Sequence, residues 1–313
     1  MKLRIGSRGS QLALWQASHI AGLLCEQSHE VEIEIIKTTG DRLQDVSFVE
    51  VGSKGMFTKE IEEALVEGRI DLAVHSLKDL PTELAEPFAL AATPPRIDPR
   101  DAFVSAKYMS LAELPEGARV GTSSQRRRAQ LKALRPDIEI VEFRGNVDTR
   151  LRKLAEGQVD AILLAAAGLE RLGKTDWLRE RLEPQNFCPA AGQGALAIET
   201  RKGDAPTIGA IGFLNDTDTS FAVTAERAAL AALGGGCQVP IGIHSRMKFP
   251  AHHKPQDEIF AVVASPQTGE VVRIHHVAER NHTDPEAFGR HAAKMLLQAG
   301  AGPLLQAASG APQ

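Results

Sequence analysis

Residues 71–81 read Asp-Leu-Ala-Val-His-Ser-Leu-Lys-Asp-Leu-Pro, an apolar run followed at once by polar side chains. A short apolar run bounded by polar residues is typical of a buried strand, so we expect a strand over 71–74. Upstream, the pattern predicts strands over 3–5 and 31–36, and Ser10 is a candidate N-cap of the helix between them. This alternation predicts a mainly parallel sheet with helices on both faces.

A second α/β segment follows a proline-rich stretch at 94–99. Gly121-Thr122-Ser123-Ser124 is expected to join a strand to a helix, and later strands are expected at 138–143, 161–165 and 195–199, the last returning to the first domain. A helix over 222–233, three strands and a closing helix over 285–298 complete the pattern. The predicted domains are 1–95 with 195–213, then 99–189, and finally 217–313.

Composition narrows the classes of function. The chain has 313 residues, 43% of them hydrophobic and 24% charged, as in ordinary soluble proteins. A formal net charge of −4 gives no overall attraction to nucleic acid or to an anionic membrane. We expect no membrane span and no secretory signal, and we therefore expect the protein to be located in the cytoplasm. The three cysteines are widely spaced, which predicts neither a disulfide framework nor a metal site.

Positive charge is concentrated between Arg119 and Lys153, where ten basic residues face four acids. Arg126 and Arg127 follow an expected strand-to-helix turn, where they oppose the helix dipole and require a compensating anion. Arg144 and Arg150 fall near the carboxyl end of the next strand, the edge at which α/β sheets bind ligands. This pattern predicts a site for carboxylates or phosphates. No phosphate-binding loop motif is present, and aromatic residues are too few for nucleic-acid stacking.

Asp79 lies just beyond the strand at 71–74, where ligands bind, although a turn or capping role is also open for it. His75 is a candidate base or a structural histidine. Gly6-Ser7-Arg8-Gly9-Ser10 is a second strand-to-helix turn with an arginine and predicts a second anion site.

Residues 234–242 read Gly-Gly-Gly-Cys-Gln-Val-Pro-Ile-Gly and place Cys237 on an open loop. The glycines either make this thiol accessible or only end the alanine-rich helix before it. A helix C-terminus does not stabilise a thiolate, which favours an attachment point over a fast nucleophile.

Together these stretches resemble the porphobilinogen deaminase family. The resemblance rests on the segments 7–16, 52–57, 73–81, 98–103, 121–127, 144–150, 189–194 and 235–242 in that order, and it spans nearly the whole chain. It implies an α/β fold of two periplasmic-binding-protein-like (type II) domains around a cleft, with a smaller α+β C-terminal domain that carries a three-stranded antiparallel sheet. It also implies a monomer without nucleic-acid or membrane partners.

The resemblance further implies a transferase that joins four porphobilinogen molecules head to tail on a dipyrromethane cofactor and then releases hydroxymethylbilane by hydrolysis. Asp79 would be the catalytic carboxylate, and Cys237 would hold the cofactor covalently. By matching position, the other cofactor-binding residues would be Lys78, Ser76, Thr122, Ser124, Arg126, Arg127 and Arg150. The substrate-binding residues would be Arg8, Ser10, Arg144, Arg171, Lys54 and Phe57, and no metal is implied.

Two rival functions share parts of this pattern. A non-catalytic binding protein for an anionic metabolite would have the same two-domain cleft but would not need Cys237. A cysteine acyl transferase or hydrolase would need a histidine base near Cys237, and His244 has no supporting motif. The chain also departs from the family at Gln125, Arg128 and Glu50, which leaves their roles open.

Overall fold

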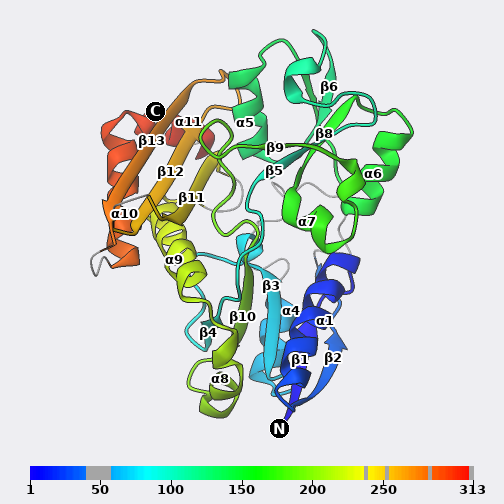
Figure 1. Cartoon of the computed structure of the whole chain (residues 1–313), viewed down its shortest axis with the longest axis vertical. Helices are drawn as coiled ribbons and strands as arrows, with labels where there is room; N and C mark the ends of the chain where they lie inside the picture. The colour runs from blue at the N-terminus through cyan, green and yellow to red at the C-terminus, as the bar shows by residue number, and fades with distance from the viewer. Residues whose placement is uncertain (40–57, 236–238, 251–253, 281–283, 310–313) are drawn as a thin grey trace. The chain divides into compact units, whose positions relative to one another are not determined.

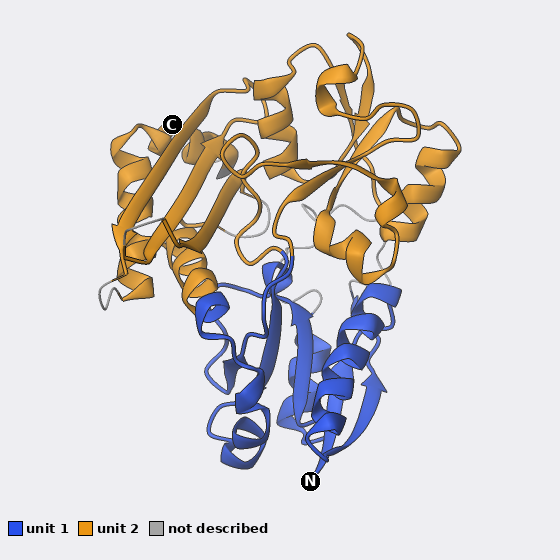
Figure 2. Ribbon diagram, in the orientation of Figure 1, with its two compact units in different colours: residues 1–97, 194–220 blue, residues 98–193, 221–313 orange. Residues whose placement is uncertain are grey.

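The computed structural model describes residues 1–39, 58–235, 239–250, 254–280 and 284–309. These residues form two compact units (Figure 2), which we describe separately: unit 1 comprises 1–97 and 194–220, and unit 2 comprises 98–193 and 221–313. The boundaries of three separate domains stay a prediction.

Unit 1 is built on a five-stranded sheet with the order β2-β1-β3-β10-β4 (Figure 1). Its strands are β1 (Lys2–Ser7), β2 (Glu30–Ile35), β3 (Leu72–Ser76), β4 (Phe88–Ala92) and β10 (Leu196–Arg201). Strands β1, β2 and β3 pair in parallel, whereas β10 runs antiparallel to both β3 and β4. The returning strand expected at 195–199 is therefore confirmed, and it makes the sheet mixed.

Helices cover both faces of this sheet, as the sequence predicts. On one face, α1 (Gln11–Glu26) and α8 (Ala205–Ile211) pack against alternate residues such as Leu72, Val74 and Ile198. On the other face, α4 (Lys59–Val66) packs through Ile61 and Leu65 against Ala73. The period of two along each strand sends neighbouring side chains into these two different layers.

The first half of unit 2 repeats this design in the order β7-β6-β8-β5-β9. Its strands are β5 (Asp101–Val104), β6 (Arg119–Gly121), β7 (Glu139–Val141), β8 (Ala161–Ala165) and β9 (Leu178–Leu182). Three strands are parallel, and β5 runs antiparallel to β8 and β9. Helix α5 (Gln125–Leu134) covers one face, and α6 (Val147–Ala155) with α7 (Ala166–Arg171) covers the other.

The second half of unit 2 contains the expected three-stranded antiparallel sheet. Its strands are β11 (Ile241–Lys248), β12 (Gln256–Ala264) and β13 (Val271–Glu279). One face packs against α9 (Thr217–Ala232), α10 (Pro285–Gln298) and α11 (Ala301–Ser309). The other carries Phe260 and Val262, which pack against Cys188. The chain was expected to be disordered from Ala307, but α11 extends to Ser309 because Ala301 and Leu304 are buried in this core.

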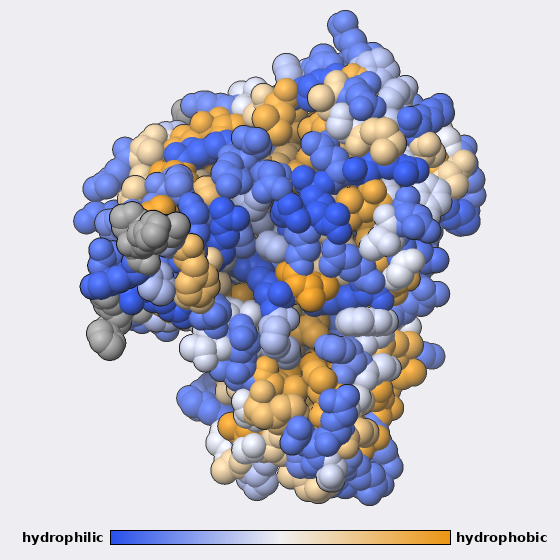
Figure 3. Space-filling model, viewed as in Figure 1, coloured by the Kyte–Doolittle hydropathy of each residue, from blue (hydrophilic) through white to orange (hydrophobic). Residues whose placement is uncertain are grey.

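Short 3-10 helices complete the described fold: η1 (Leu77–Asp79), η2 (Leu111–Glu113), η3 (Thr175–Trp177) and η4 (Gly212–Leu214). Aliphatic side chains dominate the buried core, as the low aromatic content requires. On the face seen in Figure 3, hydrophilic residues cover much of the surface and hydrophobic residues form separate patches. No helix in the described part of the chain combines the length and hydropathy that a membrane crossing requires.

Candidate anion site and catalytic turn

The end of β3 carries the predicted catalytic segment into η1, where Asp79 is exposed and Lys78 is partly buried. Two hydrogen bonds fix where this turn begins. The Leu77 N–H donates to the Ala195 carbonyl at 3.1 Å, and Gln16 Nε2 donates to Ser76 Oγ at 2.7 Å. The turn is thus tied to the segment before β10 and to α1, which holds Lys78 and Asp79 at the carboxyl edge of the sheet.

His75 faces the opposite layer from Ser76. Its Nε2 lies 2.9 Å from Glu199 Oε2, and both side chains are buried. Glu199 stands opposite Ala73 in the antiparallel register, so it reaches His75 diagonally along the same face of the sheet. His75 is thus held by a buried carboxylate partner, which sequence reasoning did not identify.

The second predicted anion site lies at the turn between β1 and α1. Ser10 has extended backbone angles and its Oγ accepts the Ala13 N–H at 3.3 Å, so the predicted N-cap is confirmed. Arg8 is partly buried beside this helix N-terminus. The structure thus places an arginine and a capping serine together, as the sequence analysis expected, at the carboxyl end of β1.

The turn between β6 and α5 has the same construction in unit 2. Ser124 Oγ accepts the Arg127 N–H at 3.4 Å, and Thr122 Oγ1 accepts the Ser124 N–H at 3.2 Å. Gly121 is required here, because a Cβ at this position would meet the Phe143 ring at 2.6 Å. The predicted strand-to-helix turn is confirmed: Ser124 is the N-cap of α5, and Thr122 and Ser124 both shape the helix N-terminus.

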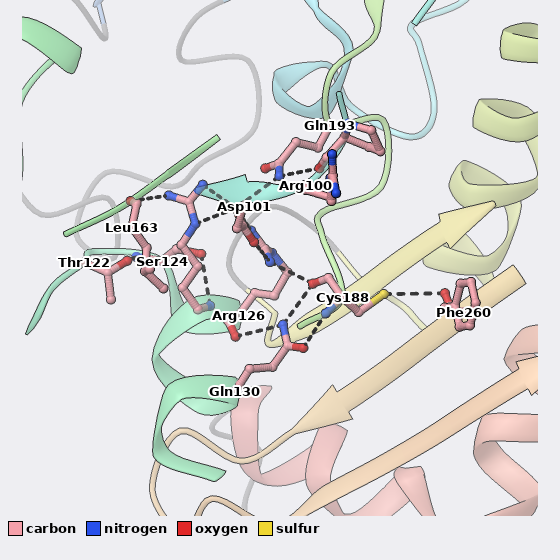
Figure 4. A network of polar contacts seen from close by, with 12 residues as sticks. Arg100, Asp101, Thr122, Ser124, Arg126, Gln130, Leu163, Cys188, Gln193 and Phe260 are labelled. Atoms are coloured by element: carbon pink, nitrogen blue, oxygen red, sulfur yellow. Dashed lines mark hydrogen bonds and ion pairs between the residues drawn. The ribbon is translucent and has the colours of Figure 1, made fainter. Parts of the chain in front are cut away.

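Arg126 and Arg127, both almost fully buried, share one carboxylate, that of Asp101 (Figure 4). Arg126 Nη1 lies 2.6 Å from Asp101 Oδ2, and Arg127 Nε and Nη2 lie 3.0 and 2.7 Å from Oδ1. Burial opposes the ionisation of Asp101, but the two guanidinium groups outweigh it and hold the pKa of this carboxyl below its usual range. Asp101 therefore supplies one of the compensating anions that the arginine positions require.

Further contacts join this cluster to the three-stranded sheet. The Cys188 carbonyl accepts from Arg126 Nη1 at 2.8 Å and from Gln130 Nε2 at 2.9 Å, while Gln130 Oε1 accepts the Cys188 N–H. The Cys188 thiol donates to the Phe260 carbonyl on β12 at 3.5 Å (Figure 4). Burial raises the pKa of this thiol, so Cys188 stays protonated and structural. Gln193 Nε2 donates to Asp101 Oδ1 at 3.0 Å and closes the cluster.

Arg150, on α6, is a buried cation whose positive charge the described contacts compensate only in part. Its Nε is buried, and among the described residues none accepts a hydrogen bond from it. Burial, followed by the positive charges of Arg127 and Arg144, lowers the pKa of Arg150 to about 10, although Glu142 opposes this effect. A buried guanidinium beside like charges is unfavourable unless an anion binds it. The side chain therefore fits a ligand carboxylate.

Arg144 and Arg171 complete the predicted arginine set. Arg144 Nε donates to Glu142 Oε1 at 2.8 Å, at the turn before α6. Gly145, in the left-handed region with φ of 121°, makes this turn possible. Arg171 ends α7, and burial lowers its pKa to about 10 against the opposing charge of Glu170. Arg150 lies close enough to Arg127 and Arg144 for their charges to lower its pKa.

Three predicted site residues, Lys54, Phe57 and Cys237, lie outside the described residues, as does Glu50. Sequence reasoning missed Asp101, Gln193 and Glu199 as partners of the predicted residues. A signal was present for Asp101, because the excess of basic residues after Arg119 required an acid from elsewhere. Glu199 had no such signal, since it lies 124 positions from His75 in the chain.

Comparison with known protein families finds two family models that match the chain. The model of the porphobilinogen deaminase dipyromethane cofactor binding domain matches residues 3–208, and the model of the porphobilinogen deaminase C-terminal domain matches residues 220–298. The porphobilinogen deaminase of Nitratidesulfovibrio vulgaris (strain Miyazaki F) is 48% identical over 311 residues, which cover 97% of this chain and 96% of that protein. That of Trichlorobacter lovleyi is 55% identical over 245 residues, 78% of each chain.

Among solved structures, the methionine binding protein MetQ is similar in fold at 13% sequence identity and a TM-score of 0.46, over 72% of this chain and 94% of that one. The α/β sheets and the three-stranded antiparallel sheet that the sequence predicts are confirmed by the strand pairing described above. Both family models match in order and together cover almost the whole chain. The chain therefore belongs to the porphobilinogen deaminase family, and its cofactor is dipyrromethane.

Proposed function

We propose that this protein is a hydroxymethylbilane synthase. It deaminates porphobilinogen, joins four molecules head to tail on its dipyrromethane cofactor and releases the linear tetrapyrrole by hydrolysis. Its family membership and the buried, uncompensated Arg150 together support this proposal. Each pyrrole of substrate and cofactor carries two carboxylates, which match the chemistry of the arginine cluster.

The residues for cofactor binding lie at two edges of the fold. Arg150 would donate from its buried Nε to a cofactor carboxylate. Arg126 and Arg127 would also bind the cofactor, although both already pair with the carboxylate of Asp101. Ser76, Lys78, Thr122 and Ser124 would contribute polar contacts, and Cys237 would form the thioether. When bound, the cofactor supplies the pyrrole end onto which substrate is joined. Arg8, Ser10, Arg144, Arg171, Lys54 and Phe57 would serve the incoming pyrrole.

Asp79 would stabilise the positive charge that develops when ammonia leaves the substrate and the next ring is attacked. An exposed carboxylate at the edge of the sheet can face the pyrrole N–H groups of a bound ligand. Its backbone position is fixed by the hydrogen bonds at Ser76 and Leu77. A carboxylate held in place before the reaction stabilises a transition-state charge without reorganising.

We further propose that the protein acts as a monomer in the cytoplasm, without nucleic-acid or membrane partners. The rival reading as a non-catalytic binding protein is not favoured by the family match. The reading as a cysteine hydrolase is also weakened. His244 is almost fully buried, with Nδ1 3.4 Å from Glu226 Oε1, so its ring has little access to a substrate.

Covalent attachment is tested by intact mass together with Ehrlich's reagent, which colours pyrroles. Purified wild-type protein should carry the added mass of dipyrromethane and should colour, whereas Cys237→Ala should do neither. Cys25→Ala is the matched control, because this exposed cysteine should leave the attachment unchanged. A Cys237→Ala protein that still carries the dipyrromethane mass would refute the tether.

The catalytic role is tested with Asp79→Asn. We expect cofactor attachment to survive and turnover of porphobilinogen to fall below about one thousandth of wild type, since an ionised group facing the developing charge is lost. Glu83→Gln, a nearby acid outside the proposed site, is the control. Steady-state turnover close to wild type in Asp79→Asn would remove Asp79 from the mechanism.

A further inference from the structure

The last two residues of β3 are held from opposite faces of the sheet. Ser76 points into the layer of α1, where it accepts the hydrogen bond from Gln16 Nε2 at 2.7 Å. His75 points into the layer of α4, where its Nε2 lies 2.9 Å from Glu199 Oε2. Gln16, His75 and Glu199 are all buried. Two polar contacts, one in each layer, thus fix the strand end from which Lys78 and Asp79 follow.

The contact in the α4 layer is electrostatically unusual. Glu199 is completely buried, and its Oε1 has no hydrogen-bond partner among the described residues. Burial and the nearby charge of Glu199 raise the pKa of Glu62 on α4, while Thr58 and His75 oppose the shift. Arg201 follows on the same face of β10, but it donates to the Leu65 and Ile70 carbonyls and pairs with Asp204. The contact that holds Glu199 at the end of β3 is therefore the one with His75.

Unit 2 provides an independent parallel. The strand equivalent to β10 in its sheet is β5, which also runs antiparallel to its neighbours. It too carries a completely buried acid, Asp101, whose partners are Arg126 and Arg127 of the predicted cofactor site. In each sheet, the antiparallel strand supplies a buried carboxylate that holds a residue of the binding edge.

We infer that Glu199, through His75, and Gln16, through Ser76, are positioning residues for Asp79. A residue that holds a catalytic carboxylate acts on the chemical step, because misplacement by about 1 Å can reduce the rate by about a hundredfold. It does not act on the arginines that hold substrate carboxylates, so the Michaelis constant is unaffected. This inference rests on the proposed catalytic role of Asp79.

The test is a double-mutant cycle on the full-length, cofactor-bearing protein with His75→Gln, Glu199→Gln and the double variant. Cofactor content is measured by intact mass, and kcat is expressed per mole of cofactor. We expect each single variant to lower kcat about tenfold with KM for porphobilinogen within about twofold of wild type. The double variant should lose no more than the larger single loss, because both changes break one contact. Glu63→Gln, an exposed acid on α4, is the matched control.

Gln16→Leu tests the other face of the sheet and leaves the His75–Glu199 pair intact. It should show the same loss of kcat at unchanged KM, and it decides the inference if the Glu199 variants do not fold. A kcat within twofold of wild type in both His75→Gln and Gln16→Leu would overturn the inference, and so would additive losses in the cycle. Asp79→Asn is measured in the same assay. If Asp79→Asn stays active, the catalytic assignment of Asp79 fails. If Asp79→Asn is inactive while His75→Gln and Gln16→Leu keep their activity, only the positioning inference fails.

Discussion

The five-stranded sheets of the two units share one spatial arrangement of strands, although the chain connects the strands in a different order, and they compensate buried charge differently. In unit 2, Asp101 on β5 accepts hydrogen bonds from Arg126, Arg127 and Gln193, and both of its oxygens are used. In unit 1, one oxygen of Glu199 on β10 contacts the His75 ring, and the other has no partner among the described residues. Arginine stays charged at every physiological pH, whereas histidine and a half-buried glutamate exchange protons.

This difference indicates two roles for a buried acid at the same place in one spatial arrangement of strands. Around Asp101 the charge is fixed, which suits a site that must hold carboxylates continuously. Around Glu199 the contact is with a histidine ring at the end of β3, which suits a turn whose geometry matters for a chemical step. The different roles of the two buried acids can be tested by changing one acid or one cation at a time.

The largest effect is expected from Asp101→Asn. It leaves Arg126 and Arg127 buried without their shared carboxylate, and breaking a buried ion pair costs about 3–5 kcal/mol of unfolding free energy. Urea denaturation followed by circular dichroism measures the loss. Glu142→Gln is the control, because this acid is half exposed and should change stability by less than about 1 kcal/mol. Equal small effects in the two variants would mean that Asp101 does not balance the arginines.

The second largest effect is expected from Arg150→Gln, whose effect on the free energy of unfolding should depend on whether the cofactor is bound. In a Cys237→Ala background, which we expect to lack the cofactor, Arg150→Gln should leave stability unchanged or increase it, because it removes a buried charge without a described partner. In the cofactor-bearing protein the same change should cost about 1.5–3 kcal/mol, the value of a charged hydrogen bond.

Arg152→Gln serves as the control for Arg150→Gln, since Arg152 is an exposed arginine on the same helix. Its effect should be small in both backgrounds. Urea denaturation of both variants in both backgrounds, and of the two parent proteins, gives the comparison. A loss of stability from Arg150→Gln that is equal with and without cofactor would show that this arginine serves the fold and not the ligand.

The smallest effect concerns pH. The pKa of Glu62 is raised in the folded state, chiefly by burial, so the folded protein binds this proton more tightly than the unfolded chain does. Stability from this group is present at low pH and is lost as pH rises through the folded-state pKa. Glu62→Gln should therefore gain Tm relative to wild type as pH rises from about 5 to about 8. A Tm difference that is constant across this range would contradict the raised pKa.

Local features of the fold were readable from the sequence. Ser10 was recognised as a cap because capping needs only a side-chain oxygen and an N–H three residues later in the chain. The strand at 161–165 and the helix at 285–298 were predicted with their observed bounds, since period and flanking residues define them. Strands β4, β5 and β9 were not identified, because short strands beside irregular segments give weak periodicity.

The candidate site divides in the same way. The amino-acid sequence alone indicates which residues carry charge and which turns place them at strand ends. The candidate site residues identified in this way include Arg126, Arg127, Arg150 and Asp79. Only the tertiary structure decided how those charges are balanced. Asp101 joins Arg126 across 25 positions and Glu199 joins His75 across 124, through strands that pair antiparallel. Side-chain pattern is a local property, whereas the compensation of a buried charge depends on which distant strand lies beside it.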